Sequence, residues 1–145
     1  MRSKGTALFG IAVLTGAMAL TMPASGESIP MDTPVTINGI DTVCTGIADS
    51  KDDPRWKTYP IRVEFSNGGA QYLSGAHVTL FEGPKTLAAL DCAGSWVLFK
   101  LPPGSYRVEV SLLNNQGGGA RSATFSPPAH GQKRVVLQFK LQPNQ

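Results

Sequence analysis

The chain has 145 residues, of which 41% are hydrophobic and 16% charged, and 13 basic against 10 acidic residues give a net charge of +3 at pH 7. Two of the basic residues, Arg2 and Lys4, belong to a leader-like segment, and without them 11 basic residues face 10 acidic ones. A nearly neutral surface gives no electrostatic reason to expect nucleic acid or an anionic membrane as a partner.

The first 26 residues have the order of a secretory signal peptide. Arg2 and Lys4 precede an apolar run over residues 7–20, and small or polar residues follow it. The alternative is a membrane anchor. However, the run is shorter than the roughly 20 residues that span a bilayer, and it contains Gly10 and Gly16.

Two places suit the signal peptidase. Ala24 and Gly26 put small residues where the enzyme reads them, which favours cleavage after Gly26, whereas residues 17–19 fit the same pattern inside the apolar run. We expect a mature chain over residues 27–145, without a transmembrane anchor, that is periplasmic or secreted. About 120 residues suffice for a single domain with one core.

The segment after the leader, "ESIPMDTPVT", holds Pro30 and Pro34 and few apolar residues, so we expect a flexible tail. Short apolar runs over 35–37 and 40–47 are candidates for additional strands. We assign residues 27–58 to an N-terminal extension and residues 59–141 to the main domain.

Within 59–141 the apolar residues recur with a period of two between turn-forming residues, which is typical of strands. Seven candidate strands follow one another: "YPIRVEF", "GAHVTLFE", "TLAALDC", "SWVLFKL", "SYRVEVSLL", "GGGARSATF" and "KRVVLQFKL". Among them "TLAALDC" has a weaker pattern, and "SWVLFKL" is apolar on both faces, as a central strand can be. Many short alternating strands with Gly and Pro turns predict an all-β fold, either an antiparallel sandwich or a small barrel.

The chain has two cysteines, Cys44 and Cys92, and an exported protein meets an oxidising compartment. We therefore predict a disulfide between them. In the simple chain model, closing so long a loop removes about 4 kcal/mol of unfolded-state entropy. The alternative is a pair of buried free thiols.

The stretch "YLSGAHVTLFEG…CAGSWVLFKLPPGSYRVEVSL" resembles the carboxypeptidase regulatory-like domain, which is a transthyretin-like sandwich. The chain is also similar to small periplasmic proteins of Gram-negative bacteria in which "VCTG", "DPRW" and "LPPGSYRVEV" recur in this order. The resemblance implies a seven-stranded antiparallel Greek-key sandwich. It also implies an accessory or interaction module without catalytic residues of its own.

The segment "CTGIADSKDDPRW" raises the question of a metal site, because Asp49, Asp52 and Asp53 could supply oxygen ligands to Ca²⁺. Their spacing is not that of a calcium loop, and Lys51 and Arg55 add positive charge among the acids. We expect a structural connection in which Arg55 pairs with an aspartate and Trp56 packs over one end of the core, with a binding epitope as the lesser alternative.

Other chemistries have little support. His77 and His130 are far apart and are weak candidates for zinc ligands. No serine lies in a Gly-x-Ser-x-Gly motif, and the segment 114–120 joins two strands, not a strand and a helix as a phosphate-binding loop would. We therefore expect no enzyme activity, no metal and no cofactor.

Two binding functions remain. An envelope or periplasmic protein could pair with an exposed sheet edge or cover an apolar patch that includes Phe81 and Val136. A polysaccharide would require exposed aromatic rings, for which Trp56, Tyr59, Tyr72 and Trp96 are candidates. We favour the protein partner, and the predicted binding residues of the chain are Trp56, Tyr59, Tyr72, Phe81 and Val136.

Overall fold

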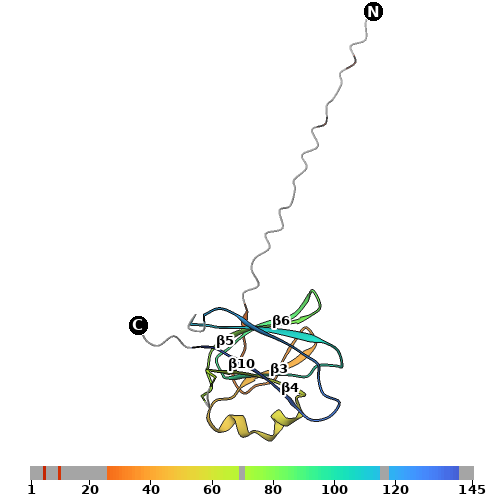
Figure 1. The fold of residues 1–145 in the computed structure, drawn as a ribbon. Coiled ribbons are helices and arrows are strands. Elements are labelled where there is room, and N and C mark those ends of the chain that lie inside the picture. Colours follow the sequence, from red (N-terminus) through yellow and green to blue (C-terminus); the bar gives the residue numbers. More distant parts are fainter. Residues whose placement is uncertain (1–4, 6–9, 11–25, 69–70, 115–117, 141–145) are drawn as a thin grey trace, which may run out of the picture.

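Two five-stranded β-sheets face each other in the computed structural model (Figure 1). The structure describes Gly5, Gly10 and residues 26–68, 71–114 and 118–140. Of the predicted signal peptide over 1–26, only Gly5, Gly10 and Gly26 are among the described residues.

The first sheet has the spatial order β1-β6-β5-β8-β9. Its strands are β1 (Glu27–Ser28), β6 (Lys85–Cys92), β5 (Ala76–Glu82), β8 (Tyr106–Leu112) and β9 (Arg121–Phe125). The second sheet has the order β10-β4-β7-β3-β2. Its strands are β10 (Lys133–Gln138), β4 (Ile61–Ser66), β7 (Trp96–Phe99), β3 (Ile40–Thr45) and β2 (Val35–Ile37). Two short 3-10 helices, η1 (Ala48–Asp52) and η2 (Pro54–Thr58), join β3 to β4.

The all-β prediction is confirmed, but the number of strands is not. The seven predicted strands of residues 59–141 form β4 to β10, and residues 27–58 add β1, β2 and β3, so the two sheets hold ten strands. The candidate strands over 35–37 and 40–47 are confirmed as β2 and β3, whereas β1 was not predicted. Pairing is also not uniformly antiparallel, because β1 runs parallel to β6 and β10 runs parallel to β4. Periodicity reports the faces of a strand but not its neighbours or their direction.

The prediction of a flexible tail after the leader is wrong for residues 27–34. Glu27 and Ser28 pair with β6, the Ile29 side chain is buried, and the Asp32 N–H donates to the Cys44 carbonyl at 2.8 Å. Pro30 and Pro34 do not prevent this, because proline is tolerated where a segment runs along the border of a sheet.

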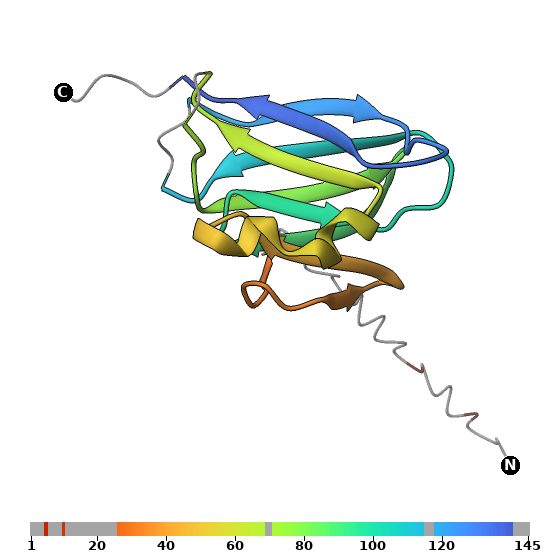
Figure 2. The same cartoon turned by 90° about the horizontal axis from the view of Figure 1, so that it is seen from below.

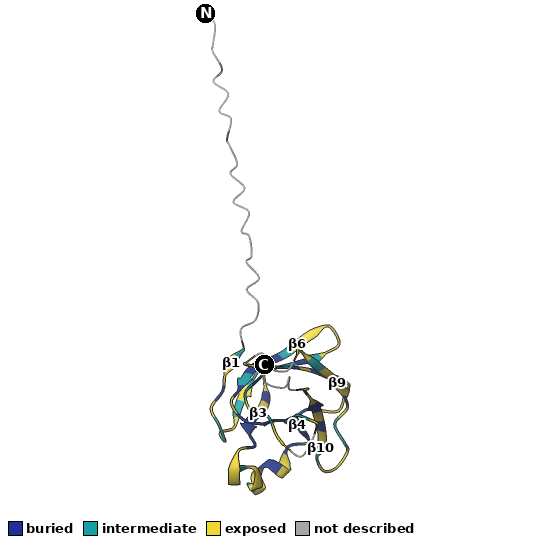
Figure 3. Cartoon of the chain, turned by 60° about the vertical axis from the view of Figure 1, so that its left-hand side comes forward, coloured by how far each residue is buried: buried dark blue, intermediate teal, exposed yellow. Residues whose placement is uncertain are grey.

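The core lies between the sheets and follows the predicted alternation. In β4, for example, Ile61, Val63 and Phe65 are fully buried in it. The same two-residue period holds in the inward residues of β5, β8 and β10, which are Ala76, Val78, Leu80, Val108, Val110, Leu112, Val135 and Leu137. Buried stretches therefore lie on strands of both sheets (Figure 3). Burying one face of each sheet against the other supplies most of the hydrophobic stabilisation.

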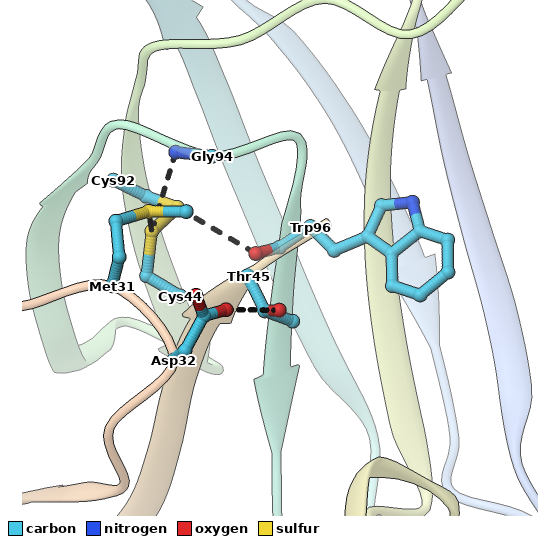
Figure 4. The surroundings of a disulfide bond; sticks show 7 residues. All are labelled: Met31, Asp32, Cys44, Thr45, Cys92, Gly94 and Trp96. Carbon is cyan, nitrogen blue, oxygen red and sulfur yellow. Dashed lines mark hydrogen bonds between the residues drawn. A yellow bond between two sulfur atoms is a disulfide. The ribbon is translucent and has the colours of Figure 1, made fainter. Parts of the chain in front are cut away.

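The predicted disulfide is confirmed, and it ties the two sheets together. Cys44 of β3 and Cys92 of β6 are both fully buried, with Cα atoms 5.5 Å apart (Figure 4). Gly94 N–H points at the Cys44 sulfur from 3.4 Å. Position 94 has no room for a side chain, because a Cβ there would collide with the carbonyl oxygen of Thr45. The bond thus anchors residues 27–58 to the rest of the domain.

Replacing both cysteines, as Cys44→Ala/Cys92→Ala, should lower the free energy of unfolding by about 3–4 kcal/mol, because the bond closes a loop of 48 residues. Chemical denaturation of the variant and of the wild type measures this. Reduced wild-type protein is the control, because it loses the cross-link but keeps both sulfurs. An unchanged denaturation midpoint in both samples would contradict the prediction.

Candidate functional site

The outer face of the second sheet is divided into a covered half and an open half. The covered half lies under η1 and η2, whose coils run along the sheet that contains β3 and β4 (Figure 2). There Val43, Leu98, Trp56 and Tyr59 form a small second hydrophobic cluster, and Trp56 and Tyr59 are only 3% and 4% exposed. The segment "CTGIADSKDDPRW" therefore acts as a structural cover over this half of the sheet. Trp56 packs in this outer cluster and not, as predicted from the sequence, over one end of the core.

Hydrogen bonds hold that cover in place. The Trp56 indole N–H donates to the Ser50 carbonyl at 2.7 Å, and the Gln132 amide donates to the carbonyls of Trp56 and Tyr59. Asp53 caps η2 by accepting the Arg55 backbone N–H, and its carboxylate also pairs with the Arg55 guanidinium at 2.8 Å. The side-chain hydrogen bond from Arg55 lowers the pKa of Asp53 below its ordinary value. The expected pairing of Arg55 with an aspartate is confirmed.

The open half of the same face contains a cavity of about 300 Å³, which we call the β4–β10 pocket. Its lining residues are Glu64, Ser66, Gln71, Tyr72, Arg134, Val136 and Gln138. Strands β4 and β10 supply five of them, because Glu64 pairs with Val136 and Ser66 with Gln138 in parallel register, and Arg134 precedes them on β10. An antiparallel bridge between Ser66 and Tyr72 brings Tyr72 next to the end of β4.

Glu64 is the electrostatic centre of the β4–β10 pocket. Its side chain has no exposed surface, and its Oε2 accepts hydrogen bonds from Arg134 Nε at 2.9 Å and pairs with Nη2 at 2.7 Å. The Tyr72 hydroxyl donates to Oε1 at 3.3 Å. Arg62 Nε lies 3.2 Å from the same oxygen, but without the alignment of a hydrogen bond. A buried carboxylate needs such partners, because burial without them is costly.

The two arginines differ in their exposure. The Arg62 side chain is 20% exposed and lies over the Trp96 ring, with Cζ 4.2 Å from the ring centroid. The Arg134 side chain is 54% exposed, and the hydrogen bond to Glu64 raises its pKa further above the ordinary value. Arg134 is therefore a permanent cation that reaches solvent from a fixed position.

Trp96 packs beneath these side chains on the outer face of β7. It is 5% exposed and contacts Tyr72 edge-on, with ring centroids 5.8 Å apart. Its side chain points away from the disulfide in Figure 4, and its indole nitrogen is buried without a hydrogen-bond partner. The face of Trp96 is thus covered by a guanidinium and is closed to a ligand.

The five predicted binding residues lie at three separate places. Tyr72 and Val136, which are 37% and 42% exposed, line the same pocket. Trp56 and Tyr59 are buried in the small cluster, so neither ring is available to a ligand. Phe81 lies on the other sheet, half-buried, with the Arg107 guanidinium 4.1 Å from its ring centroid.

Sequence reasoning missed Glu64 and Arg134 as site residues. Alternation placed Glu64 on an outer face, where a charged side chain is normally solvated. Its main partner lies 70 residues away on another strand. The local signal was the Arg-x-Glu pattern in "IRVEF", which puts two opposite charges on one face of β4.

The two histidines do not meet. His77 pairs with Asp91 at 2.6 Å on the outer face of the first sheet, and His130 is exposed in the turn before β10. Among the described residues, no three His, Cys, Asp or Glu side chains gather in a way that could hold a metal ion.

Removing Arg134 should destabilise the protein more than removing the charge of Glu64. Arg134→Gln leaves a fully buried carboxylate without its best partner, at a cost of about 2–3 kcal/mol, whereas Glu64→Gln leaves a half-exposed arginine and costs about 1 kcal/mol. Urea denaturation at pH 7 measures both. Lys133→Gln, on the same strand but outside the pocket, is the control. The reverse order of the two costs would contradict this account of Glu64.

Burial raises the pKa of Tyr59 and of Tyr106 above the ordinary 10.0. Below pH 10 both states of the protein keep these protons, and above it the unfolded chain loses them first. The two tyrosines therefore make their full contribution to the free energy of unfolding below about pH 10. That contribution falls as the pH rises towards the pKa values of the folded protein. Denaturation midpoints between pH 8 and 11 test this, and Tyr59→Phe should flatten the decline. An equal decline in that variant would contradict the role of Tyr59.

Neither a comparison with protein-family models nor one with curated protein sequences finds a match to this chain. Within the part of the chain that the structure describes, no helix has the length and apolar character needed to cross a membrane.

Proposed function

We propose that this protein is a non-catalytic β-sandwich module that works in the periplasm or outside the cell and binds a protein partner through the β4–β10 pocket. The observation that carries the proposal is the pocket itself. It joins a half-exposed arginine, an exposed tyrosine and an exposed valine on the rigid face of a sheet.

The chemistry of this surface favours a protein partner. Arginine, tyrosine and tryptophan are the side chains most enriched at the energetic centres of protein interfaces. Arg134 and Tyr72 line the pocket, Trp96 packs against Tyr72, and Arg62 lies over the Trp96 ring. Because Glu64 and Trp96 hold these groups in place, a partner would meet a surface whose side chains are already ordered, which lowers the entropic cost of binding.

The proposed compartment is supported by two features. The N-terminal residues have the order of a signal peptide, and the two cysteines form a buried intramolecular disulfide. Disulfides persist mainly in oxidising compartments such as the periplasm and the extracellular space.

The resemblance to the carboxypeptidase regulatory-like domain agrees with this role, and we propose the transthyretin-like Greek-key arrangement on that basis. The stretch "LPPGSYRVEV" contains the turn after β7 and the first residues of β8, and the Tyr106 hydroxyl closes the turn by donating to the Pro102 carbonyl at 2.8 Å. Domains of this kind accompany other proteins as accessory modules, so the resemblance supports binding more than catalysis.

The pocket is a poor candidate for catalysis. Both oxygens of Glu64 already accept hydrogen bonds, so this carboxylate is not free to act as a base. Ser66 lies in the pocket, but a serine nucleophile needs a base beside it. His77 cannot serve as that base, because it lies on β5 of the other sheet.

A polysaccharide partner is the alternative, and it has less support. Sugar rings stack on exposed aromatic faces, but Trp56 and Tyr59 are buried and Trp96 is covered by Arg62. Tyr72 alone remains exposed among the four aromatic residues considered.

Photocrosslinking in cells tests the proposal. A photoreactive residue at Val136 should give a discrete adduct with another protein, because this side chain is exposed at the pocket. The matched control is Ser122, which is exposed on β9 of the other sheet and should give no such adduct. Equal adducts at both positions, or no adduct at Val136, would contradict the proposal. A smear of envelope polymer would favour the polysaccharide.

A further inference from the structure

We propose that the β4–β10 pocket recognises a carboxylate of its partner, presented by an aspartate or glutamate side chain of a peptide segment. This inference rests on the proposed function, because it names the chemistry by which the partner would be bound. It follows from the charge, the exposure and the size of the pocket.

The accessible charge of the pocket is positive. Two guanidinium groups, on Arg62 and Arg134, surround the single carboxylate of Glu64. Glu64 has no exposed surface and both its oxygens are occupied, so it cannot receive a cationic ligand. The Arg134 side chain is 54% exposed, so a ligand that enters the pocket meets the cation and not the anion.

Arg134 is also held in a suitable orientation. Glu64 engages its Nε and Nη2 atoms, which fixes the plane of the guanidinium. The group carries further N–H donors, and paired N–H donors match the two oxygens of a carboxylate. Glu64 therefore orders the Arg134 side chain before the ligand arrives. Binding of the partner's carboxylate then costs little further side-chain entropy.

The remaining lining residues fit a peptide. Ser66, Gln71 and Gln138 offer hydroxyl and amide groups that can hydrogen-bond to a peptide backbone, and Tyr72 and Val136 offer exposed apolar surface beside them. A cavity of about 300 Å³ is at the lower end of the range for ligand sites. It suits one acidic side chain and the adjoining backbone better than a larger ligand.

An NMR titration of the purified protein tests the inference with two matched probes, N-acetyl-glutamate N-methylamide and its glutamine counterpart. The glutamate probe should shift the resonances of Tyr72, Val136 and the Arg134 Nε–H. It should also bind about tenfold more tightly than the glutamine probe, because the glutamine probe replaces the ion pair with a hydrogen bond from the guanidinium to a neutral carbonyl. This comparison uses the wild-type protein and does not depend on the folding of a variant.

Two variants locate the effect. Arg134→Gln should remove the preference for the glutamate probe. Lys133→Gln, which removes one charge from the same strand outside the pocket, should keep it. The thermal unfolding of each variant is recorded first, and only folded protein is titrated.

The opposite results would overturn the inference. Equal binding of the two probes would show that the pocket does not distinguish a carboxylate from an amide. The absence of any shift at about 50 mM of the glutamate probe would show that the pocket does not bind a carboxylate even with millimolar affinity. If glucuronate binds more tightly than the glutamate probe, the ligand of the pocket would be an acidic sugar and not a peptide. If a protein adduct still forms at Val136 while the probes bind equally, the proposed function stands and only the carboxylate is wrong.

Discussion

The structure depends on the shared burial of two sheets whose strands come from different parts of the chain. Residues 27–58 cannot form a sheet alone, since β2 and β3 gain a buried face only against the strands of residues 59–141. The Cys44–Cys92 bond fixes this arrangement, because it joins β3 of one sheet to β6 of the other inside the common core. The hydrophobic contact between the sheets and the covalent link thus reinforce each other.

The outer face of the second sheet shows how the same strands support a candidate site. Rigid neighbours on both sides hold β4 and β7, so the side chains that point outward from them have fixed positions. At one end the η1–η2 segment covers this face with Trp56 and Tyr59. The other end of this face is not covered by that segment and contains Glu64 with Arg62 and Arg134. A buried charge is unusual in a small sandwich, and here it orders the groups that remain accessible to a partner.

Much of this was predictable from local patterns. The stretch "IRVEF" shows why: period-two alternation puts Ile61, Val63 and Phe65 on one face, and the structure buries all three. The segment 27–58 shows the limit. Its strands are short and are separated by Pro30, Pro34 and Gly39. The apolar runs of β2 and β3 were visible as candidates, but β1 had no local signal, and the buried surface that stabilises these strands comes from residues far along the chain.

By itself, the sequence determined the all-β class, the inward and outward residues of β4, β5, β8 and β10, and the disulfide. Each of these depends on alternation, on the redox compartment of two cysteines or on a few neighbouring residues. The tertiary structure alone decided the parallel pairing of β10 with β4, and with it the contact between Glu64 and Arg134 across 70 residues. Strand neighbours are set by the free energy of the whole assembly, and no local pattern of residues encodes them.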